Sequence, residues 1–204
     1  MRIIHKAGFA LNQNVDIACN SANNFLLHDS SGAGILREHS GKLTTKQKQK
    51  YQKLLDKLNP KIKNLYERIA QQHSWQPHYA NLRAIQLLLQ QSNQQFKKGA
   101  AIYDNNWTQK KHHKKVIHII CVAYHVTLTS RKRKPATLYS IKSATKKALH
   151  IAQQKGAKSF AINVPCARKG YGITPNQSYR AVVQTLQKNG DFLDKAVICF
   201  DKKQ

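Results

Sequence analysis

The stretch VDIACNSANNFLLHDSSGAGILREHSG, residues 15–41, decides the fold of this chain. Its first residues, Val15 to Cys19, form an apolar run that is typical of a short buried strand. Residues 30–34, SSGAG, are small or polar and predict a loop with many free backbone N–H groups. Because a helix can start at Ile35, the loop N–H groups and a helix N-terminus would meet at one place. This arrangement suits an anion such as a diphosphate, and a tight turn without a ligand is the alternative.

The rest of the chain alternates strands and helices around a second glycine-bearing loop. Residues 158–164, KSFAINV, predict a strand, residues 165–175 predict the loop, and Thr174 with Pro175 can open the next helix. Further strands are expected at residues 2–6, 100–103, 116–124 and 195–200, with a helix capped by Ser140 and ended by Gly156. This alternation predicts a largely parallel sheet covered on both faces, which binds ligands beyond the carboxyl ends of its strands. Both loops follow strands at that edge, which favours a phosphate-bearing ligand.

Residues 42–98 differ in composition, being rich in Lys, Gln and Leu. Thr44 or Thr45 can cap a first helix, Asn59 and Pro60 separate it from a second, and a third follows Pro77. Apolar residues recur at helical spacing in all three: Tyr51, Leu54, Leu55 and Leu58; Ile62, Leu65, Tyr66 and Ile69; Leu82, Ile85, Leu88 and Leu89. The pattern predicts a helical insertion that shapes a site, binds a partner or merely packs.

The chain is strongly basic, with 35 Lys and Arg, 9 Asp and Glu, and a formal net charge of +26. Such a field attracts polyanions, so net charge alone keeps nucleic acid and anionic membrane surfaces open as partners. The two dense runs, KKHHKK at 110–115 and RKRK at 131–134, lie beside predicted strand ends and are interpreted first as solvated loop charge. Neither run interleaves aromatic residues as a single-strand stacking platform would.

The four cysteines are dispersed over predicted core strands and their ends, which indicates free thiols and a reducing cytosol. The sequence has no apolar run of membrane-spanning length and no secretory signal near residues 1–13. A cytoplasmic protein is therefore expected. Its Lys, Gln, Asn and His-rich composition also fits an effector delivered into a host cytosol, with an organelle surface as one destination. His118 and Cys121 lie on opposite faces of one strand, so no metal site is predicted there.

The motifs VDIACNSANNFLLHDSSGAGIL, GAAIYDNNW, VIHIICVAY, KSFAINVPCARKGYG and VICFD, in this order, resemble the macro domain, the ADP-ribose-binding module. The resemblance covers residues 1–41 and 99–204 and leaves residues 42–98 as an insertion. It implies one domain over residues 1–204, with a three-layer α/β/α fold, a mixed, mostly parallel sheet and the α-helical insertion within it. The chain is expected to be a monomer.

The resemblance also implies a cleft that holds the diphosphate between the two loops and needs no cofactor, ADP-ribose being ligand or product. Asn23 matches the family's asparagine at the distal ribose, and His28 follows it as in viral-type macro domains. Asp29 can supply a carboxylate from a shifted position, a solvent-facing turn aspartate being the alternative. Asn23, His28 and Asp29 are therefore the candidate catalytic residues. The candidate ligand-binding residues are Phe9, Asn20, Ser30, Ser31, Gly32, Ala33, Gly34, Ile35, Cys166, Ala167, Arg168, Lys169, Gly170, Tyr171, Gly172 and Phe200.

The sequence departs from the family at several of these positions. Ala33 stands where many hydrolytic members have an aspartate, Phe9 replaces the aspartate that contacts adenine, and Arg168 and Lys169 replace small hydroxyl residues. Asp29 can supply the carboxylate that an N-glycosidic cleavage needs. The favoured function is thus an ADP-ribosyl hydrolase acting on a mono-ADP-ribosylated protein, a host protein included, with arginine linkage. A non-catalytic ADP-ribose reader and a basic nucleic-acid or membrane binder are the alternatives.

Overall fold

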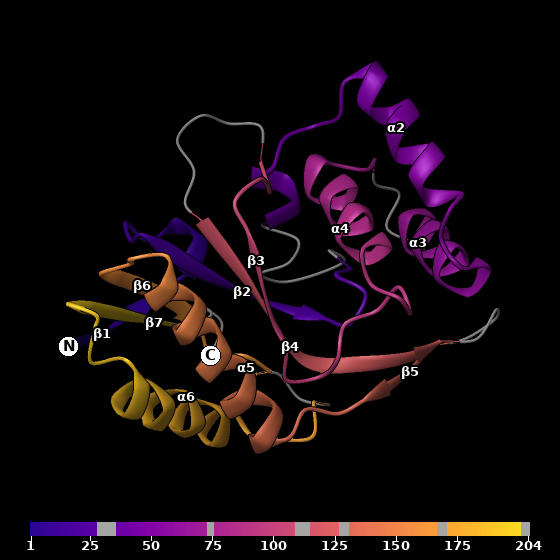
Figure 1. Cartoon of the computed structure of the whole chain (residues 1–204). Coiled ribbons are helices and arrows are strands. Elements are labelled where there is room, and N and C mark those ends of the chain that lie inside the picture. The colour runs from indigo at the N-terminus through magenta and orange to yellow at the C-terminus, as the bar shows by residue number, and fades with distance from the viewer. Residues whose placement is uncertain (28–35, 73–75, 109–114, 127–130, 167–170, 201–204) are drawn as a thin grey trace.

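A computed structural model of the chain describes residues 1–27, 36–72, 76–108, 115–126, 131–166 and 171–200, apart from the side chains of 125 and 131. Its sheet has seven strands, with the order β1-β7-β6-β2-β4-β3 and with β5 paired to β4 (Figure 1). The strands are β1 (Arg2–Ala7), β2 (Ile17–Asn23), β3 (Ala101–Asp104), β4 (Lys115–Val126), β5 (Arg131–Lys134), β6 (Ser159–Asn163) and β7 (Lys195–Phe200). Strands β1, β7, β6, β2 and β4 pair in parallel, whereas β3 and β5 run antiparallel to β4. The expected mixed, mostly parallel sheet is confirmed.

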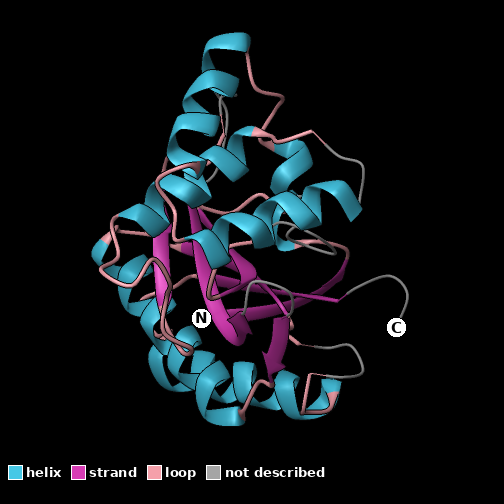
Figure 2. Cartoon of the chain, turned by 90° about the vertical axis from the view of Figure 1, so that its right-hand side faces the viewer, coloured by secondary structure: helices cyan, strands magenta, loops and turns pink. Residues whose placement is uncertain are grey.

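Helices cover both faces of the sheet, as Figure 2 shows. They are η1 (Ala10–Asn12), α2 (Thr45–Leu55), α3 (Pro60–Gln72), α4 (Tyr79–Leu89), α5 (Leu138–Gln154) and α6 (Pro175–Asn189), together with helical residues 36–39. Helices α5 and α6 pack on one face, and α2, α3 and α4, which lie within residues 42–98 and are called the insertion below, pack over the other (Figure 1). The three-layer α/β/α class is therefore confirmed. No helix in the described part of the chain is both long and apolar enough to cross a membrane.

The side chains of β4 alternate between the two faces of the sheet and contribute to two hydrophobic cores. Ile117, Ile119 and Cys121 join the core beneath α5 and α6, while Ile120 joins the core of the insertion. Successive residues of a strand point to opposite faces, so a run that is apolar on both faces indicates burial on both sides. His118 shares the face of Ile120, which separates it from Cys121 as its spacing predicts.

Three expectations about element ends are corrected by the structure. Strand β2 does not stop before Asn20 but extends to Asn23, because its asparagine side chains find buried hydrogen-bond partners. Helix α5 is capped by Thr137 rather than Ser140, which serves as the third residue of a reciprocal capping box. The run at 131–134 is not a loop but strand β5, antiparallel to the end of β4.

Candidate functional site at the carboxyl edge of the sheet

Phe9, Asn23, Cys166 and Phe200 lie at one edge of the sheet. Parallel strands β1, β7, β6 and β2 end there at Ala7, Phe200, Asn163 and Asn23, respectively. Phe9 and Cys166 follow the first and third of these strands within three residues. Sequence positions up to 190 residues apart, roughly, are thus brought side by side, as expected of ligand sites in open parallel sheets.

Asn163 holds the turn that presents Phe9, a role that the sequence analysis missed. Its Oδ1 accepts a 2.8 Å hydrogen bond from the Ala10 N–H, and its Nδ2 donates to the Gly8 oxygen at 3.1 Å. The Gly8 N–H in turn donates to the Phe200 oxygen at 2.7 Å, and Gly8 has φ of 108°. The turn after β1 is therefore fixed to the ends of β6 and β7. An asparagine closing an otherwise apolar strand was the available signal.

Phe200 belongs to an aromatic cluster on the outer part of this edge. Its ring centroid lies 6.0 Å from that of His5 and 5.8 Å from that of Tyr179. The Tyr179 hydroxyl also lies 3.1 Å from His5 Nε2, which joins α6 to β1. The edge at β1 and β7 is thus lined by rings, a surface suited to a flat aromatic ligand group.

Asn23 uses its carboxamide to shape the turn that leads into the first loop. Its Oδ1 accepts from the N–H groups of Phe25 (3.0 Å) and Leu27 (3.2 Å), and its Nδ2 donates to the Leu27 oxygen at 3.3 Å. Leu26 takes a positive φ of 50° at the centre of this turn. Asn23 is 6% exposed, so its side chain acts first as a local scaffold.

The insertion holds the same turn from outside. Phe25, Leu26 and Leu27 are buried members of the insertion's own hydrophobic core. The Tyr66 hydroxyl of α3 donates to the Phe25 oxygen at 2.6 Å, and the Phe96 N–H donates to the Asn24 oxygen at 2.8 Å. The insertion is consequently continuous with the start of the first loop rather than a separate appendage.

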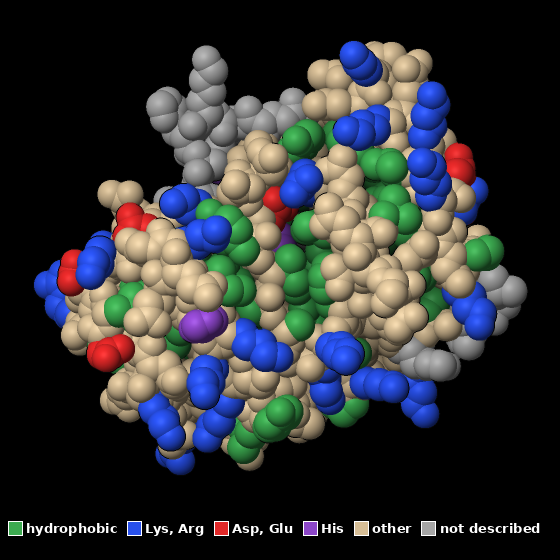
Figure 3. All heavy atoms as spheres, in the orientation of Figure 1, with side chains coloured by type: hydrophobic (Ala, Val, Ile, Leu, Met, Phe, Trp, Pro, Cys, Tyr) green, Lys and Arg blue, Asp and Glu red, His purple; other side chains and the backbone are tan. Residues whose placement is uncertain are grey.

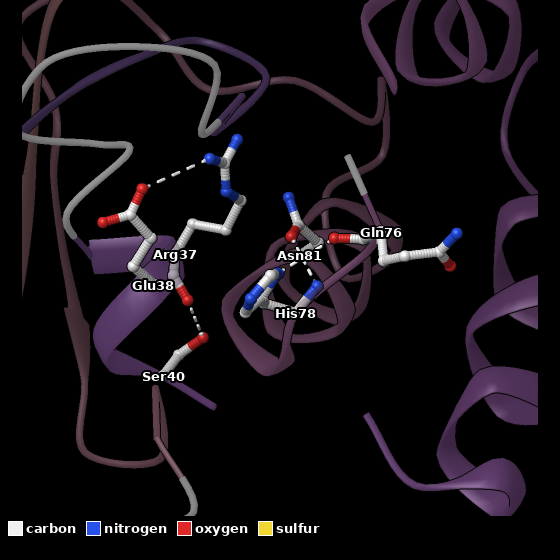
Figure 4. Close-up of polar contacts among 6 residues, drawn as sticks. All are labelled: Arg37, Glu38, Ser40, Gln76, His78 and Asn81. Carbon is white, nitrogen blue, oxygen red and sulfur yellow. Dashed lines mark hydrogen bonds and ion pairs between the residues drawn. The ribbon is translucent and has the colours of Figure 1, made fainter. Parts of the chain in front are cut away.

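The far end of the first loop is held by the insertion as well. Ser40 is fully buried, and its Oγ donates to the Arg37 oxygen (2.6 Å) and accepts from the Ala80 N–H of α4 (2.9 Å). The Tyr79 N–H donates to the Gly41 oxygen at 2.9 Å. Figure 4 shows the contacts among Arg37, Glu38 and Ser40 beside the capped start of α4, where His78 contacts Asn81 and Gln76. Both flanks of residues 28–35 are therefore anchored on the insertion.

A row of buried polar groups crosses the sheet beneath α4. Asn20 Nδ2 lies 3.2 Å from His118 Nδ1, and both residues are 2% exposed. Arg83 of α4 forms a 3.0 Å ion pair with Asp104, whose side chain is 1% exposed. Burial lowers the pKa of His118; Asp104 opposes this and Arg83 adds to it. The predicted ligand residue Asn20 is thus engaged by a neutral histidine inside the fold.

The end of the second loop is fixed by β5 and the start of α5. Gly172 has φ of 89°, and a Cβ at this position would lie 2.5 Å from the Pro135 Cβ. The Ala136 N–H donates to the Tyr171 oxygen at 2.8 Å, and the Arg133 guanidinium carbon lies 4.5 Å from the centre of the Tyr171 ring. Arg133, expected to be solvated loop charge, therefore positions the second loop through a cation–π contact.

Cys166 begins the second loop as a buried thiol. It is 8% exposed, has φ of 57° and belongs to the core beneath α5 and α6. A hydrogen bond with Cys166, together with burial, raises the pKa of the Cys121 thiol well above its ordinary value. At the end of the strand before it, the Ser178 hydroxyl of α6 donates to the Pro165 oxygen. These contacts fix the point where the loop leaves the sheet.

Several candidate residues lie outside the described residues: His28, Asp29, Ser30, Ser31, Gly32, Ala33, Gly34 and Ile35 of the first loop, and Ala167, Arg168, Lys169 and Gly170 of the second. Among the residues that the structure does describe, no three His, Cys, Asp or Glu side chains gather as metal ligands. A pocket of about 360 Å³ opens elsewhere, within the insertion, where Tyr51, Gln52 and Glu67 contribute to its lining.

No protein-family model matches the sequence, and no curated protein matches it. Solved structures do match. The macrodomain of Mycobacterium tuberculosis DarG is 13% identical, with 97% of each chain covered and a TM-score of 0.53. The GDAP2 macro domain is 12% identical, with a TM-score of 0.59, covering 99% of this chain and 78% of that one. A Trypanosoma brucei macrodomain solved with ADP-ribose is 13% identical, with a TM-score of 0.55, covering 98% and 64%.

Proposed function

We propose that this chain, which has the macrodomain fold, binds ADP-ribose at the carboxyl edge of its sheet and removes mono-ADP-ribose from a modified protein. One observation carries the proposal. The solved structures that it resembles over nearly its whole length include a macrodomain bound to ADP-ribose. The arrangement of this chain's edge, with aromatic rings at one end and Asn23 at the other, supports the same ligand.

In this proposal the ligand lies across the edge from the rings to Asn23. Phe9 and Phe200 contact the adenine, residues 30–35 and 166–171 surround the diphosphate, and the distal ribose reaches Asn23. Loop N–H groups neutralise phosphate charge without a metal ion. The basic field of the chain, +26 overall, raises the local concentration of such an anion.

The proposed reaction is cleavage of the N-glycosidic bond between ribose and an arginine side chain. Asp29 acts as the carboxylate that stabilises an oxocarbenium-like transition state or activates water, and His28 assists proton transfer. Asn23 orients ribose hydroxyls through its carboxamide. Arginine is the preferred linkage because an N-glycosidic bond needs a carboxylate more than an activated acyl ester does, and the remodelled first loop offers one.

A non-catalytic ADP-ribose reader is the second candidate, and one observation favours it. The Asn23 carboxamide already makes three hydrogen bonds within its own turn, which leaves it little capacity for a substrate. Ala33, which stands where many hydrolytic members have an aspartate, and Phe9, which stands where the family usually has the aspartate that contacts adenine, point in the same direction.

The decisive experiment separates binding from turnover. Calorimetry with free ADP-ribose measures binding, and incubation with proteins labelled on arginine or, separately, on glutamate measures release. Release from arginine supports the hydrolase, and release from glutamate alone refutes the linkage. Binding of ADP-ribose without release of any label supports the non-catalytic reader. Absence of both binding and release rejects ADP-ribose as the ligand.

A further inference from the structure

Helix α2 carries a row of lysines along its outer side. Lys46, Lys50, Lys53 and Lys57 are spaced by four, three and four residues, so they lie on one face of the helix and its C-terminal turn. All four are exposed. At 1.5 Å per residue the row is about 16 Å long. Figure 3 shows Lys and Arg side chains spread over the visible face, with several along the outer side of α2.

No carboxylate among the described residues pairs with these lysines. Helix α2 contains no acidic residue, and Asp56 at its C-cap is bound by Lys63 at 2.7 Å and by Gln52 at 3.2 Å. Within the part of the chain that the structure describes, none of the four lysines forms an ion pair. Four ammonium groups in a row, without acidic partners there, repel one another and attract a linear polyanion.

The opposite face of α2 is already occupied. Tyr51 and Leu55 are buried in the core of the insertion, where α2 packs against α4. An amphipathic helix that lies in a membrane interface buries its apolar face between lipids. Because the apolar face of α2 packs inside the protein, a lipid surface would contact only a single convex row of charges.

We propose that the α2 lysine row, Lys46, Lys50, Lys53 and Lys57, binds the phosphate backbone of nucleic acid. At 3.4 Å of duplex axis per nucleotide in each strand, about 16 Å of helix spans roughly five phosphates. The row presents ammonium groups and no aromatic platform, so binding is independent of base sequence and weakens steeply with salt. This surface lies on the insertion, away from the edge proposed for ADP-ribose, and does not depend on that function.

The test compares two variants with equal net charge. K46Q/K50Q/K53Q/K57Q removes the row, whereas K142Q/K146Q/K147Q/K188Q removes four exposed lysines from α5 and α6 on the other side of the sheet. Anisotropy titrations use fluorescein-labelled duplex and single-stranded oligonucleotides at several salt concentrations. Circular dichroism and thermal unfolding verify that both variants fold.

We expect the row variant to lose about tenfold or more in affinity and to lower the magnitude of the duplex salt slope by about 3 to 4, at about 0.9 for each lost phosphate contact. The control variant should change both quantities far less. Equal losses in the two variants, or no binding by the unaltered protein, would overturn the proposal. Tighter binding to phosphatidylserine vesicles than to either oligonucleotide would reject nucleic acid as the partner.

Discussion

The Tyr66 hydroxyl of the insertion donates a 2.6 Å hydrogen bond to the backbone oxygen of Phe25, two residues after Asn23. Tyr66 is 1% exposed and Phe25 is 4% exposed, so no solvent replaces this bond when it is lost. Burial raises the pKa of Tyr66 well above its ordinary value, which keeps the phenol protonated as a donor. This buried contact therefore links the helical insertion to the entrance of the first loop.

Tyr66→Phe should lower the free energy of unfolding by about 1–3 kcal/mol, because it leaves a buried carbonyl without its donor. ADP-ribose affinity should fall as well if the turn positions the first loop. Tyr51→Phe is the matched control, since Tyr51 is a buried tyrosine of the same core whose hydroxyl has no hydrogen bond among the described residues. Urea unfolding and calorimetry measure both effects. Equal effects from the two variants would contradict the role given to Tyr66.

Asn23→Ala should weaken both turnover and stability, because it removes the acceptor for the Phe25 and Leu27 N–H groups. Asn23→Asp keeps that acceptor but loses the amide donor, so it should fold better than Asn23→Ala and still turn over poorly.

Asp29→Ala should abolish release of ADP-ribose while leaving unfolding unchanged. Unaltered release by the Asp29 variant would remove this residue from the mechanism.

Gly172→Ala should destabilise the second loop more than an ordinary glycine substitution does. The positive φ alone costs a side chain about 1–2 kcal/mol, and the new Cβ would also lie 2.5 Å from Pro135. Gly156→Ala provides the control, because Gly156 has a positive φ of 68° but open space around its Cβ position. Gly172→Ala should have a lower melting temperature than Gly156→Ala in thermal unfolding. The reverse order would show that Pro135 can move away from the new Cβ at little cost.

Asp104→Asn should lower the free energy of unfolding by about 3 kcal/mol, since it leaves the Arg83 guanidinium unpaired beside a buried amide. Asp56→Asn breaks a shorter ion pair, 2.7 Å to Lys63, yet should change stability little because water screens it. Urea denaturation of the two variants shows whether the burial of an ion pair or its distance decides how much it contributes to stability. Similar losses would mean that the Arg83 pair is screened despite its position.

Stability should decrease below about pH 6.5 because of His118. Its pKa is lowered in the folded protein by burial, so the unfolded chain binds the proton more readily. Neutral His118 contributes its full stabilisation of the folded protein above the unfolded-state pKa of about 6.5. This contribution is lost as the pH falls through the lower pKa of His118 in the folded protein. The free energy of unfolding should fall by no more than about 1.4 kcal/mol per pH unit. His118→Gln should flatten this slope, whereas His150→Gln, an exposed histidine on α5, should not.

Hydrophobic periodicity was sufficient to locate most elements of the fold. Local patterns predicted the three helices of the insertion, the strand at 116–124 and the opening of α6 at Thr174, because side-chain spacing and caps act within a few residues. For α2 they predicted a threonine cap at 44 or 45, and the structure shows Thr44. The strand character of 131–134 did not follow. Four consecutive basic residues carry no strand signal, and β5 exists because the end of β4 offers it a partner.

Some residues of the candidate site could likewise be predicted from the sequence, and others could not. Sequence alone placed Phe9, Asn20, Asn23, Cys166 and Phe200 after or near strand ends, and parallel topology then requires that these ends share an edge. Asn163, Arg133 and Tyr66 were missed. Their partners, at Gly8 and Ala10, Tyr171, and Phe25, are 38 or more residues away in the chain, and no local pattern encodes such a contact.

The sequence by itself predicted a macrodomain-like sheet and three helices between residues 42 and 98, since these depend on short-range periodicity and on the order of motifs. Only the tertiary structure decided that the insertion holds both flanks of the first loop. That result depends on buried hydrogen bonds between residues 24–25 and the insertion, and between Ser40 and α4. Hydrogen bonds of this kind form because backbone groups taken out of water require partners, wherever in the chain those partners lie.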